Sequence, residues 1–215
     1  MQFNTYIFIM VFLPVLVTGY FLFNKINSQM GKIFLIAGNV LFYLYGGIDT
    51  ALLLGVSILF NFAVAKIMDR KNKMNKILFV LAISTNIGLL FYYKYCNFFI
   101  ENVNSLLKTD FEMKNIILPL GISFFTFQQI SYIASVYRNE IDHICCMDYL
   151  AYITYFPKLV MGPLIEPADF IVQLNDKRLK SIHWENVANG IKVFSFGLFK
   201  KMVLADTFST AVNWG

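Results

Sequence analysis

Charged side chains are scarce in this sequence. They make up 14% of its 215 residues, whereas hydrophobic residues make up 58%. Soluble domains carry about 25% charged residues, and a soluble core of this length has no room for so much apolar surface. The composition therefore excludes an ordinary soluble domain and indicates an integral membrane protein.

Cysteine, histidine and the common enzyme motifs are also in short supply. The three cysteines are odd in number and lack CxxC spacing, so no disulfide framework is expected. There are two histidines and no GxSxG elbow, P-loop, HExxH or dinucleotide fingerprint. The net charge of +5 is small and locally clustered, which does not suit a nucleic-acid partner.

The chain contains several long hydrophobic runs. We expect spans near residues 5–23, 33–45, 50–65, 77–95, 116–137, 149–165 (re-entrant or spanning) and 190–206. The first run has its basic residues after it, which favours an uncleaved helix over a signal peptide. Residues 96–107 are mildly apolar and suit the membrane interface. The predicted fold is all-α: a polytopic helical bundle with re-entrant or interfacial segments.

Residues 66–76 are the clearest marker of topology. They contain five basic residues and one acidic residue, a net charge of +4. Short loops rich in Lys and Arg stay in the cytoplasm, which puts the N-terminus outside after three crossings. The alternative for this basic run is binding of anionic lipid or of a partner.

A polar stripe follows one face of the predicted helix at 116–137. From Asn115 to Tyr137 the sequence has 23 residues without a formal charge. At about 100° per residue, one face holds Gly121, Phe124, Gln128, Ser131, Ser135 and Arg138. Such a face should contact other helices or a water-filled cavity. Inter-helix hydrogen bonding suits Ser131 and Ser135, and a cavity or pore lining is the alternative for Gln128 and Arg138.

The stretch 149–170 interrupts its own helical pattern. The breaks fall at Pro157, Gly162, Pro163 and Pro167. Lys158 lies among them, in an otherwise apolar segment. Irregular backbone at membrane depth persists only where protein or a water-filled cavity satisfies it. A re-entrant element lining a cavity explains this pattern, and the alternative is an interfacial helix with Lys158 snorkelling to water.

A cluster of possible metal ligands lies just before that stretch. It comprises Asp142, His143, Cys145, Cys146 and Asp148. Their spacing matches none of the common zinc pairings, so no metal site is expected. Reduced cysteines in a cytoplasmic loop are the default interpretation, and reversible palmitoylation of Cys145 or Cys146 is the alternative.

Three motifs together resemble the membrane-bound O-acyltransferase (MBOAT) family. They are LPLGISFFTFQQISYIASVYR, YFPKLVMGPLIEPADF and GLFKKMVLAD, in that order. The likeness is to the bacterial branch typified by the membrane subunit of alginate O-acetylation. It extends loosely from the first hydrophobic segment to residue 215.

The resemblance implies a function in the bacterial cytoplasmic membrane. An acyl group, most often acetyl, would pass from a cytoplasmic thioester donor (acetyl-CoA or an acyl carrier) toward an extracytoplasmic polysaccharide, with an extracytoplasmic partner protein. No bound cofactor is implied. Transfer of D-alanine to teichoic acid is the alternative within the family. A transporter or channel subunit is the alternative outside it, and would require repeat symmetry.

No catalytic residue can be transferred from the family to this sequence. Its members use a buried histidine well downstream of the GLFKK motif as the catalytic base, and they are considerably longer. We therefore interpret residues 1–215 as an N-terminal part of one such transmembrane domain, inactive by itself. The candidate substrate-path residues are Gln128, Ser131, Ser135, Arg138, Lys158, Gly162 and Pro163. Lys158 departs from the family, where a neutral amide is frequent, as do Glu166 and Pro167, where a basic residue is usual.

The topology gives a direct prediction. A cysteine introduced at Asn72, in the basic loop, should react only with reagents that reach the cytoplasm, because the net charge of +4 keeps this loop inside. Labelling of intact cells with an impermeant maleimide measures this. Reaction from outside would overturn the assignment for the first four helices.

Overall fold

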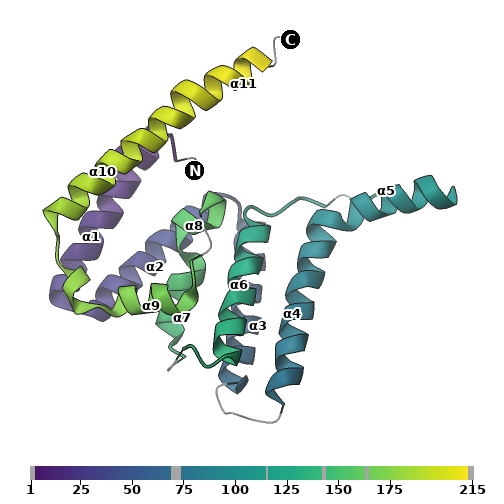
Figure 1. The fold of residues 1–215 in the computed structure, drawn as a ribbon, viewed down its shortest axis with the longest axis horizontal. Coiled ribbons are helices and arrows are strands. Elements are labelled where there is room, and N and C mark those ends of the chain that lie inside the picture. Colours follow the sequence, from purple (N-terminus) through teal and green to yellow (C-terminus); the bar gives the residue numbers. More distant parts are fainter. Residues whose placement is uncertain (1–2, 69–73, 115, 142–143, 163–164, 213–215) are drawn as a thin grey trace. The chain divides into compact units, whose positions relative to one another are not determined.

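Every regular element in the described part of the chain is a helix (Figure 1). The computed structural model describes residues 3–68, 74–114, 116–141, 144–162 and 165–212. The first elements are η1 (Phe8–Phe12), α1 (Leu13–Ile26), α2 (Ser28–Leu44), α3 (Ile48–Met68), α4 (Asn75–Leu90), η2 (Phe91–Tyr95) and α5 (Cys96–Leu107). After them come α6 (Ile122–Tyr137), α7 (Cys146–Thr154), α8 (Phe156–Met161), α9 (Pro167–Asn175), η3 (Lys177–Lys180), α10 (Trp184–Phe199), η4 (Lys200–Ala205) and α11 (Asp206–Val212).

Within the described residues, three helical stretches are long and apolar enough to cross a membrane. They are Phe8–Ile26, Ile48–Met68 and Asn75–Leu107. On α3, Leu52, Val56 and Leu59 keep most of their surface exposed while Leu54 and Ile58 are buried. A helix that is apolar all round suits a lipid environment. The predicted all-α membrane fold is confirmed.

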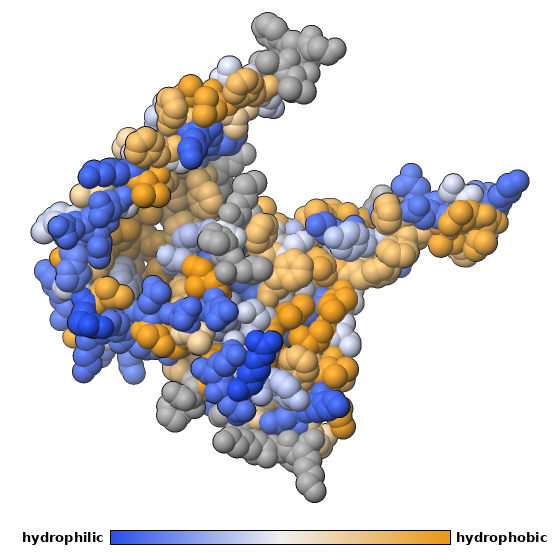
Figure 2. Space-filling view, in the orientation of Figure 1, coloured by the Kyte–Doolittle hydropathy of each residue, from blue (hydrophilic) through white to orange (hydrophobic). Residues whose placement is uncertain are grey.

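Helix α5 continues directly from α4 through the π-helical turn η2. The chain changes direction there, and α5 points away from the axis of α4 (Figure 1). Apolar residues lie along one edge of α5 and polar residues along the other (Figure 2). Phe98, Phe99 and Leu106 are exposed on it beside Glu101 and Asn102. This amphipathic surface is the kind that lies in a membrane interface.

The chain divides into two compact units, and the first combines residues 1–34 with residues 176–215. In this unit α1 packs closely on the start of α2. A Cβ added at Gly19 would lie 2.3 Å from the ring of Phe34, so glycine permits this approach. The same unit contains η3. There the guanidinium of Arg178 donates a hydrogen bond to the carboxylate of Asp176 and lowers the pKa of that carboxyl.

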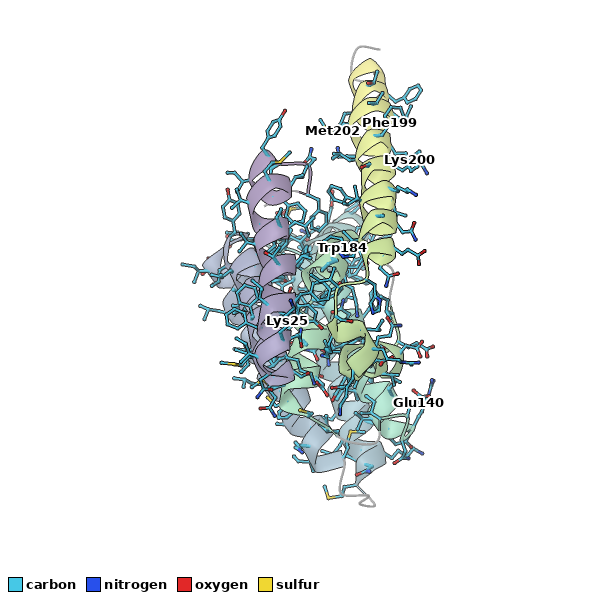
Figure 3. All side chains as sticks on the ribbon, turned by 90° about the vertical axis from the view of Figure 1, so that its left-hand side faces the viewer. Lys25, Glu140, Trp184, Phe199, Lys200 and Met202 are labelled. Atoms are coloured by element: carbon cyan, nitrogen blue, oxygen red, sulfur yellow. The ribbon has the colours of Figure 1, made fainter. Side chains whose placement is uncertain are left out.

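The C-terminal helices of the same unit expose their side chains on every side. Phe199, Lys200 and Met202 all project outward (Figure 3). Lys201 forms an ion pair with Asp206, and exposed pairs of this kind stabilise little.

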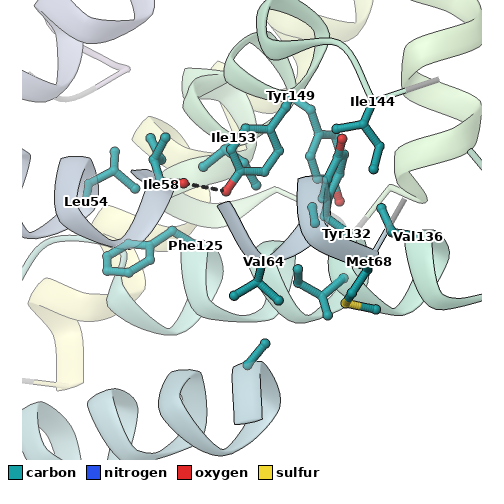
Figure 4. Packing of buried hydrophobic residues seen from close by; sticks show 14 of the residues in the cluster. Leu54, Ile58, Val64, Met68, Phe125, Tyr132, Val136, Ile144, Tyr149 and Ile153 are labelled. Carbon is teal, nitrogen blue, oxygen red and sulfur yellow. Dashed lines mark hydrogen bonds between the residues drawn. The ribbon is translucent and has the colours of Figure 1, made fainter. Parts of the chain in front are cut away.

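The second unit, residues 35–175, is built around α6. This helix contacts α3, α4, α7, α8 and α9. Its buried side chains Phe125, Tyr132 and Val136 pack against Leu54, Val64 and Met68 of α3 and against Tyr149 and Ile153 of α7 (Figure 4). The core of the unit therefore lies where these helices meet.

A buried polar network links the helices that surround α6. Asn61 of α3 and Asn86 of α4 exchange side-chain hydrogen bonds of 2.7 and 3.3 Å. The Tyr149 hydroxyl donates to the Gln129 side-chain oxygen and lies 3.2 Å from the carbonyl of Ile58. Ser57 lies 3.5 Å from the Gln129 amide nitrogen. Four helices are thus joined by polar contacts within an apolar core.

This network predicts a measurable coupling between α3 and α4. Changing Asn86 to Leu should lower the free energy of unfolding by about 1 kcal/mol, because the Asn61 oxygen loses its donor inside the core. Changing both residues to Leu should be less harmful than the sum of the single changes. Unfolding of the chain in detergent micelles, followed by circular dichroism, measures both values.

Thr85→Val on the exposed side of α4 is the matched control. Among the described residues its hydroxyl donates to the carbonyl of Leu81 in the same helix and to no other helix, so stability should not change. Strictly additive losses at Asn61 and Asn86 would contradict a structural role for the pair.

Candidate functional site

Helices α7, α8 and α9 form a hairpin whose two ends meet. The Asn175 amide at the end of α9 donates to the carboxylate of Asp148 at the start of α7, at 2.9 Å. The chain leaves the helical path at Tyr155, before Pro157, and again at Gly162. Pro167 begins α9, where a proline needs no helical hydrogen bond. The predicted proline and glycine breaks therefore correspond to the bends of this hairpin.

Glycine is required at position 162 by the closeness of the chain to itself. A Cβ there would lie 2.6 Å from the Cα of Lys158 and 2.8 Å from the carbonyl oxygen of Pro157. Both are backbone atoms, which cannot move aside as a side chain can. The predicted residues Gly162 and Lys158 are thus in direct contact.

The ammonium of Lys158 lies inside a group of three aromatic rings. Its Nζ is 4.0 Å from the ring centre of Phe170, 4.1 Å from that of Tyr152 and 5.7 Å from that of Tyr155. The rings come from α7, from the break after it and from α9, so the hairpin itself assembles this aromatic cage. Lys158 is 2% exposed, which contradicts the alternative of a snorkelling surface lysine.

No hydrogen bond to the Lys158 ammonium is present among the described residues. Each close ring can return about 2 kcal/mol to a desolvated cation, whereas removal of an ion from water costs several kcal/mol. The aromatic cage therefore roughly offsets the desolvation and leaves no large surplus. Three N–H donors remain available to an oxygen-bearing ligand.

Helix α6 connects to the aromatic cage through Ser131. The Tyr152 hydroxyl donates to the carbonyl of Ile165 at 3.0 Å, and its side chain also interacts with Ser131. On the same helix Gln128 is 1% exposed, and its side-chain oxygen has no hydrogen-bond partner among the described residues. Thr126 is also buried, and no described residue forms a hydrogen bond with its hydroxyl. Helix α6 thus presents further unsatisfied polar groups in the unit that holds Lys158.

The other predicted site residues differ in their surroundings. Ser135 is buried in α6. Arg138 follows the last residue of α6, and its side chain is 70% exposed and lies 3.7 Å from Glu140, so it is not part of the buried polar group. Pro163 lies outside the described residues, as do Asp142 and His143 of the cluster considered for metal binding.

Sequence reasoning missed Gln129 and the asparagine pair. Gln129 is fully buried beside Gln128, because other helices pack on more than one side of α6. The sequence did contain a signal for Asn61. Ser57 and Asn61 are polar residues four positions apart in an apolar helix. This spacing marks a polar patch on one helix face.

Curated relatives match nearly the whole chain. A peptidoglycan O-acetyltransferase of Helicobacter pylori is 33% identical over 99% of this chain and 46% of its own length. A probable alginate O-acetylase of Pseudomonas aeruginosa is 29% identical over 99% of this chain and 41% of its own. That of Pseudomonas putida is 27% identical over 99% and 44%.

The resemblance to the membrane-bound O-acyltransferase family is confirmed. This chain spans less than half the length of these curated relatives. No family model and no solved structure matches it. Lys158, which departs from the amide expected in this family, is the buried group at the centre of the hairpin.

The aromatic cage gives a prediction that separates stability from function. Lys158→Met should leave the free energy of unfolding unchanged or raise it, because a neutral chain of similar length fills the cage without desolvating a charge. Lys158→Ala should lower it by about 2 kcal/mol or more, since it leaves a cavity. Micellar unfolding of both variants is the measurement. Equal losses in the two would show that the ammonium itself holds the hairpin together.

Proposed function

We propose that this chain contributes the aromatic cage and its buried ammonium to a membrane O-acetyltransferase. The enzyme would move an acetyl group from a cytoplasmic thioester toward an extracytoplasmic polysaccharide. The observation that carries this proposal is Lys158, whose buried amino group at the turn of the hairpin has no hydrogen-bond partner among the described residues. The names of the relatives, which act on peptidoglycan or alginate, support the reaction class.

The reaction joins an acyl group to a hydroxyl. The hydroxyl oxygen of the acceptor attacks the carbonyl carbon of the thioester, and a C–O bond forms. The carbon–sulfur bond breaks, the thiol leaves, and the hydroxyl proton passes through a base to the leaving sulfur. Negative charge develops on the carbonyl oxygen as the bond forms. Donors fixed near that oxygen lower the barrier.

The ammonium of Lys158 suits the role of such a donor. The rings of Tyr152 and Phe170 contact it through their faces. These contacts do not use its N–H groups in conventional hydrogen bonds. The low polarity around it strengthens its attraction for a developing oxyanion. The frequent amide of the family also donates N–H groups, so a donor at this position is a shared property. On α6, the side-chain oxygen of Gln128 has no hydrogen-bond partner among the described residues, so it can accept a hydrogen bond from a hydroxyl of the substrate.

The base is assigned to neither histidine of this chain. His183 is exposed at the start of α10, and its Nε2 lies 2.8 Å from the carbonyl of Arg178. His143 lies outside the described residues. The family resemblance places the base histidine beyond the GLFKK motif. The residues discussed here would therefore bind and orient the acyl group.

The setting we propose is the bacterial cytoplasmic membrane, with the N-terminus outside. The donor, acetyl-CoA or an acyl carrier, would approach from the side of the basic loop at 66–76. An extracytoplasmic partner protein would complete delivery to the glycan. The names of the relatives favour acetyl over D-alanyl transfer and an enzyme over a transporter.

Deletion of the gene in its host tests this function. Ester-linked acetate, released from cell-wall and secreted glycans by mild alkali, should fall to background and return on complementation. Complementation with Lys158→Met should restore less than about a tenth of the acetate, because loss of one oxyanion donor typically lowers kcat 10²–10³-fold. Lys158→Gln, which keeps an N–H donor, should restore more than Lys158→Met.

Matched controls come from exposed positions of the same residue types. Lys177→Met on η3 and Gln173→Leu on α9 change exposed side chains and should restore full acetylation. Gln128→Leu should reduce acetylation more than it reduces the amount of protein in the membrane. Normal acetate with Lys158→Met at normal protein level would refute the donor role, and an unchanged acetate content after deletion would refute the function.

A further inference from the structure

A cavity lies at one end of the helices α3, α4 and α6, and none of the residues of the aromatic cage lines it. Its volume is about 280 Å³, and its walls come from the first turn of α3, from η2 and from the loop before α6. The C-terminal end of α3 at Met68 and the N-terminal end of α4 at Asn75 lie at the opposite end of these helices (Figure 1).

The walls of the cavity carry three kinds of chemistry. Asp49 and Thr50 supply a carboxylate and a hydroxyl, while Tyr92 and Tyr93 supply two aromatic rings. These rings are 5.2 Å apart and nearly perpendicular, at 87°. Leu53 adds an apolar surface. Hydroxyl groups of a ligand can donate to the carboxylate, and an apolar ligand face can stack on a ring.

Hydrogen bonds hold the loop before α6 against α2 and against α5, the helix that follows η2. The Tyr43 hydroxyl at the end of α2 donates to the carbonyl of Leu120 at 2.6 Å. The Asn97 side chain accepts from the backbone N–H of Lys114 at 3.0 Å and donates to its carbonyl at 2.7 Å. A cavity with prearranged walls loses less entropy on binding.

We infer that this cavity binds one uncharged, N-acetylated sugar ring of the acceptor glycan. A pyranose has C–H faces that stack on tyrosine and hydroxyl edges that a carboxylate accepts, and its acetamido methyl suits the apolar wall. The volume suits a single ring. The inference rests on the proposed function only for naming the glycan as acceptor.

The charge of the cavity lining favours an uncharged sugar over a uronic acid. Asp49 is the one charged residue in the described lining, and a uronate carboxylate beside it would be repelled. The nearby ammonium of Lys114 lies 5.2 Å from the ring centre of Tyr92 and interacts with that ring. Of the acceptors named for the relatives, peptidoglycan contains N-acetylated sugars and alginate is built of uronic acids. The cavity favours the first.

Saturation-transfer NMR on the chain in lipid nanodiscs tests this inference. Tetra-N-acetylchitotetraose should receive saturation at its ring C–H and acetyl methyl protons, and a mannuronate tetramer should bind at least severalfold more weakly. Tyr92→Ala should weaken chitotetraose binding roughly tenfold, as expected for loss of a stacked ring, and Tyr92→Phe should retain it. Asp49→Asn should weaken chitotetraose binding while improving that of the mannuronate tetramer.

Tyr95→Ala is the matched control, because Tyr95 lies on the same turn η2, is similarly exposed (41% against 45% for Tyr92) and is not part of the lining. Ile117→Trp provides a second test of the cavity if Tyr92→Ala does not fold. Ile117 is 85% exposed at the cavity, so the larger ring should block binding without disturbing the core.

Three results would overturn the inference: no saturation transfer to chitotetraose, transfer that survives both Tyr92→Ala and Ile117→Trp, or a preference for the mannuronate tetramer. No acetyl donor is present in this experiment. Failure of the proposed acetyl transfer would therefore leave the binding result intact, and loss of binding would leave the transfer reaction intact.

Discussion

A polar group buried among membrane helices cannot form hydrogen bonds with water. It must find a partner inside the protein, or remain unpaired at a cost in stability. The unit around α6 contains both outcomes. Asn61, Asn86, Gln129 and Tyr149 are paired with one another or with nearby polar groups, and their contacts fix the spacing of the surrounding helices. The apolar packing around α6 depends on that spacing, since a shift of one helix would break several of these bonds.

The buried polar groups without a described partner point to a role other than stability. Gln128, Thr126 and Lys158 are as deeply buried as the paired residues, yet polar atoms on each have no hydrogen-bond partner in the described chain. Selection for stability alone would replace such groups with apolar ones of similar size. Their presence beside a satisfied network indicates that the helices hold a polar surface ready for something else. Stability is supplied by one set of polar residues, and the other set is available for binding.

The sequence predicted what depends on local chemistry. Long apolar runs indicated the helices, and Pro157, Gly162 and Pro167 indicated the bends, because hydropathy and backbone restrictions act over a few residues. Burial of Lys158 could not be decided in this way, since Tyr152 and Phe170 are brought to the ammonium only by the hairpin. The projected stripe included Arg138 because a helical wheel assumes a continuing helix, whereas α6 ends at Tyr137. The cavity beside Tyr92 was also missed, because its walls come from three distant segments.

The bond between Asp148 and Asn175 has a consequence for how the protein is made. These residues are 27 positions apart, so the contact cannot form until the ribosome has delivered both arms of the hairpin. Until then Lys158 has only part of its aromatic surroundings, since Phe170 is on the later arm. A lone lysine-bearing arm is a poor substrate for insertion into lipid. The complete aromatic cage therefore forms only after both arms of the hairpin have been synthesised.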